Sequence, residues 1–320
     1  MAGWSGLNEA YLRDAVDIGE RALVALMEQV PLDFADIAHL AVFSTTGIAV
    51  PSLDARLMNR LPFAPTLKRL PVYGLGCAAG AAGVARVADY LAGHPDQAAI
   101  ALTVELCSLT IEPADTSVAN LIACGLFGDA AAAVLLVGDA HPLAHTNASA
   151  GGAFALGAAG GDSAPPAPPP AHAPSVEVVE SRSVFFPGTE RHMGWDVTDD
   201  GMRIVLSAGV PDTARTALRP HVEALLADHG LTIPDVGRWL CHPGGPRVVD
   251  AIEEGLGLEA GRLDDTRNLL RRVGNVSSTS VLLLLDEALR TAAEPAGTWG
   301  LMLAMGPGFG AELVLLRWTA

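Results

Sequence analysis

The chain has 320 residues, half of them hydrophobic, and a formal net charge of −16 at pH 7. Such a chain can bury a large core, as one domain or as two fused halves. The negative charge argues against nucleic acid and against an anionic membrane surface as partners. The sequence shows no secretion leader and no uninterrupted apolar run of membrane-spanning length. Its four cysteines show neither C-x-x-C nor metal-ligand spacing, so we expect a cytoplasmic protein with reduced thiols and no metal.

Helical and strand-like segments alternate along the chain, which predicts an α/β layered fold. The predicted helices are Asn8–Gln29, Ser52–Leu61, a segment from Cys77 to Leu91, Pro211–His229, Arg247–Leu256 and Val281–Arg290. The predicted strands are Ile37–Thr46, Leu70–Leu75 (expected to be buried), Ala98–Leu109, Ala130–Gly138, Val176–Phe186, Met202–Leu206, the segment ending at Cys241, Trp299–Met305 and Ala311–Trp318.

One stretch, rich first in Gly and Ala and then in Pro, interrupts this pattern near the middle of the chain. It has too few large apolar residues to pack, so it is interpreted as a flexible insertion. The predicted organisation is an N-terminal half over residues 1–146, the insertion over residues 147–175 and a C-terminal half over residues 176–320. The second half repeats the element order of the first, since each strand ends in a turn of small residues before a helix.

The stretch that carries most of the chemical information is LPVYGLGCAAGAAGVARVADYL, residues 70–91. It predicts a strand, a tight glycine turn and a helix whose first turn begins at Cys77. Unpaired N–H groups and the helix dipole at that point favour a thiolate over a thiol, as a nucleophile requires. Gly76 and Gly80 allow close approach of backbone or substrate. A packed core cysteine is the alternative on this stretch alone.

Two more polar residues stand at strand-to-helix turns in the second half. His242 precedes Pro-Gly-Gly, and Asn275 lies in Gly-Asn-Val-Ser-Ser. Active sites of layered α/β folds gather at such ends, and a thiol nucleophile needs a base and oxyanion donors nearby. Each residue could instead serve a turn, and a Cys/His/Asn set would also suit a cysteine hydrolase.

The flanking motifs decide between these alternatives. They are GLGCAAG at 74–80, GLFGDAAAA at 125–133, WLCHPGGP at 239–246, GNVSS at 274–278 and AMGPGFGAELVLLRW at 304–318. Together they resemble the type III polyketide synthases of the chalcone and stilbene synthase superfamily. The resemblance implies a thiolase-like αβαβα fold built from two pseudo-repeated halves. The strings VELCSLT at 104–110 and HMGWDVTDDGMRIVL at 192–206 are more similar to bacterial alkylresorcinol and alkylpyrone synthases than to plant enzymes.

The resemblance implies a role for each of these residues. Cys77 would carry the acyl group as a thioester. His242 and Asn275 would hold the thioester carbonyl of malonyl-CoA while CO2 leaves, with His242 either neutral and donating to the substrate or paired as imidazolium with a Cys77 thiolate. Phe127 would be the gatekeeper between a coenzyme A tunnel and the cavity. The partners would be acyl-CoA, malonyl-CoA and a second copy in a homodimer, with no separate cofactor.

By the same resemblance, two further sets of residues would surround the substrate. The cavity would be lined by Thr45, Thr46, Cys107, Thr110, Trp195, Ile204, Ser277 and Met305. Coenzyme A would meet Leu206, Gly244 and Arg247. Ile204 and Met305, where plant enzymes have aromatic or glycine–phenylalanine residues, suit an aliphatic acyl starter and pyrone or resorcinol products, although Trp195 could narrow the cavity.

The sequence departs from the family at its N-terminus. The family has some further residues before the segment that matches Leu7, and these supply a core strand and basic residues for coenzyme A. We therefore expect an incomplete N-terminal half, from a misplaced start or a natural truncation. Two alternatives to a polyketide synthase stay open, namely a ketosynthase III-like condensing enzyme and a truncated, non-catalytic homologue with a structural or dimerising role.

Overall fold

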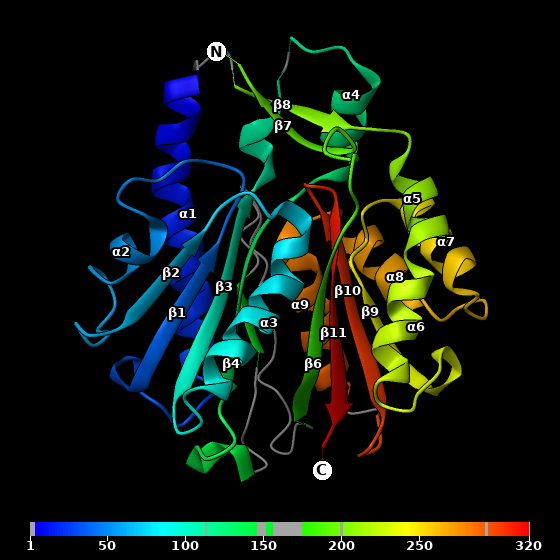
Figure 1. The fold of residues 1–320 in the computed structure, drawn as a ribbon. Helices are drawn as coiled ribbons and strands as arrows, with labels where there is room; N and C mark the ends of the chain where they lie inside the picture. The colour runs from blue at the N-terminus through cyan, green and yellow to red at the C-terminus, as the bar shows by residue number, and fades with distance from the viewer. Residues whose placement is uncertain are drawn as a thin grey trace.

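The structure is a computed structural model that describes residues 4–112, 114–145, 152–155, 175–198, 201–291 and 294–319. Within these ranges, two β-sheets face each other across the central helices α3 (Ala79–Ala92) and α9 (Ser280–Arg290), and other helices cover their outer faces (Figure 1). This arrangement gives the layer order αβαβα, which confirms the predicted α/β layered fold.

The N-terminal half forms the sheet β2-β1-β3-β4-β5. Its strands are β1 (Ile37–Phe43), β2 (Lys68–Val72), β3 (Ala98–Leu106), β4 (Asp129–Val137) and β5 (Gly152–Ala155). The strands β2, β1 and β3 run parallel, whereas β4 and β5 each join antiparallel. The outer face of this sheet packs against α1 (Trp4–Met27), and α2 (Leu53–Leu57) adds two leucines to the same core.

The C-terminal half forms the sheet β6-β11-β10-β9. Its strands are β6 (Val176–Phe185), β9 (Val236–Cys241), β10 (Trp299–Gly306) and β11 (Gly310–Trp318). The core on its outer face is filled from α5 (Val210–Ala217), α6 (Arg219–Ala227) and α7 (Pro246–Leu256). The pairing repeats that of the first sheet, because β10 joins β9 in parallel and β11 antiparallel, and β11 then joins β6 antiparallel.

Small residues explain how the central layer fits between the sheets. The buried face of α3 is mostly alanine, and β4 presents a run of four buried alanines. A side chain on Gly80 would collide with the carbonyl of Ser278, in the 3₁₀ turn just before α9. Short side chains therefore let α3 lie close both to α9 and to the sheets, and one continuous apolar core includes both central helices.

Three elements lie together at one end of the molecule, at the top of Figure 1. They are α4 (Val118–Leu126) and the hairpin of β7 (Met193–Val197) with β8 (Met202–Leu206). The side chain of Ser117 caps α4 by accepting a hydrogen bond from the Asn120 N–H. In the C-terminal half, α8 (Asp264–Val273) ends at Gly274, directly before Asn275.

Two expectations about strands differ from the structure. The strand that precedes Cys77 was expected to be buried, but β2 is exposed because it is the edge strand of its sheet. Most of the inserted stretch, 147–175, lies outside the described residues, but Gly152–Ala155 within it forms β5 on the free edge of β4. That edge offers unpaired backbone groups, which pairing with β5 satisfies. In the described part of the chain, no helix has the length and hydropathy to cross a membrane.

Candidate active site

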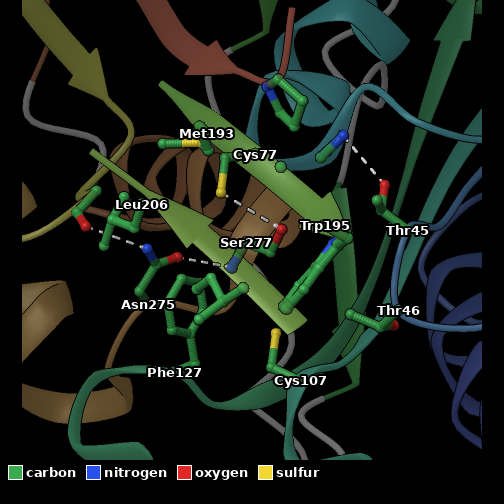
Figure 2. Close-up of a pocket in the computed structure, with 15 residues that line it drawn as sticks. Thr45, Thr46, Cys77, Cys107, Phe127, Met193, Trp195, Leu206, Asn275 and Ser277 are labelled. Atoms are coloured by element: carbon green, nitrogen blue, oxygen red, sulfur yellow. Dashed lines mark hydrogen bonds between the residues drawn. The ribbon is translucent and has the colours of Figure 1, made fainter. Parts of the chain in front are cut away.

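A cavity lies where the two halves meet, under the β7–β8 hairpin, and spans about 530 Å³ that is partly open to solvent. Figure 2 shows its residues coming from the loops after β1 and β2, from β7 and β8, and from the turn around Asn275. The wall consists of Thr45, Thr46, Gly76, Cys77, Cys107, Phe127, Met193, Gly194, Trp195, Ile204, Leu206, Gly244, Asn275, Ser277 and Pro307. These groups are apolar or neutral, and such a lining suits an uncharged, largely apolar ligand.

Cys77 lies in a 3₁₀ turn, Gly76–Ala78, immediately before α3 begins at Ala79. Its Sγ is 3.5 Å from the hydroxyl of Ser277, across the boundary between the halves (Figure 2). Burial raises the pKa of the Cys77 thiol to about 12, although the Ser277 hydroxyl acts in the opposite direction. The expectation of a thiolate at a helix start is therefore not met, because loss of solvent outweighs the turn's N–H groups. The Cys77 side chain in this structure is therefore a neutral thiol near pH 7.

Asn275 follows α8 and presents its side chain to the same cavity. Its Oδ1 accepts a hydrogen bond of 2.8 Å from the Ser277 N–H, and its Nδ2 lies 3.4 Å from the Gly244 carbonyl. The first contact fixes the amide orientation, and the second is long and weak. The amide N–H₂ of Asn275 is therefore available to a stronger acceptor in the cavity.

His242 follows β9 directly, and its backbone N–H donates to the Leu303 carbonyl on β10 at 2.8 Å. Its ring is buried, does not belong to the cavity wall, and within the described residues neither ring nitrogen has a hydrogen-bond partner. Burial lowers the pKa of His242 to about 3. The imidazole is thus neutral near pH 7, which favours the neutral donor or base over the ion pair. The structure brings Cys77 and Asn275 to one wall, with His242 joined to it through the backbone at Gly244.

The structure places most of the other predicted residues on the cavity wall. Thr45, Thr46, Cys107, Phe127, Trp195, Ile204, Ser277, Leu206 and Gly244 all line it. Three predicted residues lie elsewhere in the described structure. Thr110 turns inward and donates to the Cys107 carbonyl, Met305 packs into the core of the C-terminal half, and Arg247 is exposed at the start of α7. Spacing along a strand or helix could not show which neighbour each side chain would meet.

Glu105 on β3 is a buried carboxyl beside the cavity that sequence reasoning did not select. It accepts hydrogen bonds from the Thr45 N–H at 3.1 Å and from the Ser278 hydroxyl at 2.7 Å. Burial raises its pKa to about 7, while these hydrogen bonds act in the opposite direction. The signal in the sequence is a single acidic residue inside the apolar run of β3, since an unpaired charge is costly there. Met193, Gly194 and Pro307 on the wall carry no comparable signal.

Family models match almost all of the described chain. The N-terminal domain of chalcone and stilbene synthases matches residues 8–140, and the C-terminal domain of the same enzymes matches residues 177–319. The gap between the two matches contains the whole of the inserted stretch, 147–175.

Individual relatives agree with these matches. The chain is 44% identical to 1,3,6,8-tetrahydroxynaphthalene synthase from Streptomyces peucetius subsp. caesius, over 97% of this chain and 75% of the relative. It is 37% identical to a putative chalcone synthase from Bacillus subtilis (strain 168), over 87% of this chain and 70% of the relative. The crystal structure of tetrahydroxynaphthalene synthase from Streptomyces coelicolor A3(2), a bacterial type III polyketide synthase, superposes with a TM-score of 0.85 at 29% identity, covering 99% of this chain and 82% of that chain.

Proposed function

The chain belongs to the chalcone and stilbene synthase family as a type III polyketide synthase, and we propose that it condenses malonyl-CoA by decarboxylation onto an acyl group held by Cys77. Members of this class are acyltransferases with a thiolase-like fold. The observation that carries the proposal is the shared cavity, in which the Cys77 thiol and the Asn275 amide lie on either side of Ser277 (Figure 2).

The first step is transfer of the starter to sulfur. The Cys77 sulfur attacks the acyl-CoA carbonyl, an S–C bond forms, the bond to the coenzyme A sulfur breaks, and the thiol proton ends on coenzyme A. The thiol is neutral at rest, so it needs a base during the attack. We assign that role to His242, whose neutral imidazole has a nitrogen lone pair without a hydrogen-bond partner among the described residues.

The second step is loss of CO2 from malonyl-CoA. The electron pair of the broken C–C bond moves onto the thioester carbonyl, and the resulting enolate oxygen needs hydrogen-bond donors. Asn275 Nδ2, held only by its long contact with Gly244, and a protonated ring nitrogen of His242 supply them. Each preorganised donor is worth about 3 kcal/mol of barrier. The enolate carbon then attacks the carbonyl of the Cys77 thioester, a C–C bond forms, and the C–S bond to Cys77 breaks, which leaves the lengthened chain on coenzyme A. The Cys77 sulfur then attacks the thioester of that chain, the chain returns to Cys77, and coenzyme A leaves.

The entrance to the cavity follows from the same residues. Phe127 presents an apolar ring on the wall, which disfavours the malonyl carboxylate and favours the neutral product of decarboxylation. Leu206 and Gly244 line the same cavity, and the exposed Arg247 begins the helix that follows Gly244, where it can meet coenzyme A phosphates. The chemistry needs no cofactor besides the coenzyme A thioesters.

Two hypotheses about the starter and the product are compatible with this cavity. An aliphatic acyl-CoA suits the apolar wall formed by Ile204 and Met193, and would give pyrone or resorcinol products. The relative at 44% identity is a tetrahydroxynaphthalene synthase, and Trp195 and Cys107 on the wall reduce the room for a long chain. We retain the aliphatic starter as the first hypothesis and a tetrahydroxynaphthalene product as the second.

The test is incubation of the purified protein with radiolabelled malonyl-CoA, alone and with fatty acyl-CoA starters of increasing length, with Cys77→Ala as control. Products that need an acyl-CoA and vanish in the variant support the first hypothesis. A naphthalene product from malonyl-CoA alone supports the second. If the wild-type protein releases no CO2 and forms no product in any arm, the proposed activity is wrong.

We also propose that the protein is a homodimer. The edge strand β2 and the loop after β1 expose apolar side chains, among them Val50 at 88% and Tyr73 at 54% of their surface. An exposed apolar sheet edge is a surface for pairing with another chain. Light scattering should give twice the monomer mass, and Val50→Asp with Tyr73→Asp should lower it.

The unpaired cysteines, including the exposed Cys124, agree with a reducing, cytoplasmic location.

A further inference from the structure

The gatekeeper Phe127 and the catalytic candidate Asn275 come from different halves but are joined through their backbones. The backbone N–H of Asn275 donates to the Leu126 carbonyl at 2.7 Å, and the Gly128 N–H donates to the backbone carbonyl of Asn275 at 3.0 Å. These bonds form a parallel bridge between Phe127 and Asn275, outside the strands of either sheet. A two-bond link of this kind fixes the spacing of the two segments at the cavity wall.

A glycine stands at the closest approach on each side of this bridge. A Cβ on Gly274 would lie 2.5 Å from the Leu126 carbonyl oxygen, the acceptor of the Asn275 N–H. A Cβ on Gly128 would lie 2.8 Å from the Val273 carbonyl oxygen. Gly274 also has φ +72°, in the left-handed region that favours glycine, whereas Gly128 has no such backbone requirement. Since both obstacles are backbone atoms, any larger residue must push the segments apart.

We propose that Gly128 and Gly274 are positioning residues that hold the Asn275 amide and the Phe127 ring in register for decarboxylation, a role that rests on the function proposed above. The remaining contacts of the Asn275 side chain are within its own turn and with Gly244. The bridge is therefore the backbone link that ties its position to the N-terminal half, which supplies Cys77. Displacement of about 1 Å at a reacting group can cost about a hundredfold in rate.

The experiment compares Gly128→Ala and Gly274→Ala with Gly125→Ala. Gly125 lies in α4, three residues before Gly128, and an added Cβ there meets no atom within 4 Å. Each variant is measured for release of labelled CO2 from malonyl-CoA, for acylation of Cys77 by a starter acyl-CoA, and for hydrogen exchange at the Asn275 and Gly128 amides. Circular dichroism and thermal unfolding establish that each variant is folded.

We expect kcat for decarboxylation to fall about a hundredfold in Gly128→Ala and Gly274→Ala, with KM for malonyl-CoA much less affected. Acylation of Cys77 should persist, exchange at the two bridging amides should accelerate, and Gly125→Ala should match the wild type in every measurement. The split between decarboxylation and acylation separates positioning from a general loss of structure.

Three results would overturn the inference: folded variants that decarboxylate at the wild-type rate, an equal loss in Gly125→Ala, or slow exchange at both bridging amides in the variants. If Gly274→Ala does not fold because of its backbone strain, Gly128→Ala decides the matter. If the wild type itself does not decarboxylate malonyl-CoA, the proposed function fails. The exchange measurement still tests whether the glycines maintain the bridge.

Discussion

In the N-terminal half, the 3₁₀ turn Gly76–Ala78 leads into α3, and in the C-terminal half the 3₁₀ turn Ser277–Thr279 leads into α9. Both turns begin with a left-handed residue, Gly76 at φ +48° and Ser277 at φ +51°. The second residue is Cys77 in one turn and Ser278 in the other. The turns meet where Cys77 Sγ approaches the Ser277 hydroxyl.

The two turns share a similar backbone conformation, but they place their second side chains in different surroundings. The first turn places a thiol on the cavity wall, whereas the second places its equivalent hydroxyl, on Ser278, against the buried Glu105. The second turn also accepts a non-glycine residue at positive φ, and such strain is typical of functional positions. In the proposed mechanism, the N-terminal half therefore provides the nucleophile, and the C-terminal half provides the groups that orient the substrate.

The largest difference should come from replacing the second residue of each turn by alanine. Cys77→Ala should reduce product formation by about a thousandfold or more, because it removes the thiol proposed to carry the acyl chain. Ser278→Ala should retain measurable turnover, since it removes a hydrogen bond to Glu105 but leaves the nucleophile. Radiolabelled product assays on both variants check this. Equal losses of product formation in the two variants would contradict the different roles assigned to the two turns.

The next effect concerns Asn275, the residue proposed to orient the substrate in the second half. Asn275→Ala should lower the rate of malonyl-CoA decarboxylation by about 10²–10³, the usual cost of removing one oxyanion donor. Asn120→Ala, a buried asparagine that holds the loop before α4, is the matched control and should lower stability more than this rate. Labelled CO2 release is the measurement, and a decarboxylation rate unchanged in Asn275→Ala would contradict the assignment.

The pH dependence of stability tests the resting state of His242. Its pKa of about 3 in the folded protein lies below the ordinary value of 6.5. The unfolded chain therefore binds the proton first, so His242 stabilises the folded state above pH 6.5 and loses that contribution as the pH falls toward 3. From pH 7 to pH 5 the loss is about 2 kcal/mol. His242→Gln should lack it in denaturant unfolding, and a difference between the two proteins that is independent of pH would indicate a charged or exposed imidazole.

The smallest effect lies at the first residue of each turn. Ser277→Gly should be more stable than Ser277→Ala by about 1 kcal/mol, because both lack the hydroxyl and only the glycine relieves the positive φ. Gly76→Ala should be destabilising, since its Cβ would lie 2.6 Å from Pro307 Cδ. Thermal unfolding measures both. If Ser277→Gly is no more stable than Ser277→Ala, the backbone at Ser277 is not strained.

The sequence predicts the order of the elements and the turns that carry Cys77, His242 and Asn275, because small residues at strand ends are a local signal. It does not show which strand becomes an edge, and the apolar run before Cys77 was therefore expected to be buried. Side-chain direction is also non-local, so Thr110 and Met305 could not be distinguished from Thr45 and Ile204. The neutral state of Cys77 depends on burial by residues far apart in the chain.

The measurement that tests the central claim most directly is mass spectrometry of the protein digested after incubation with a starter acyl-CoA alone. The account predicts the acyl mass on the peptide containing Cys77, and none on the peptides containing Cys107, Cys124 or Cys241. Turnover by a protein whose Cys77 stays unmodified, or an adduct that persists on another cysteine in Cys77→Ala together with activity, would contradict it.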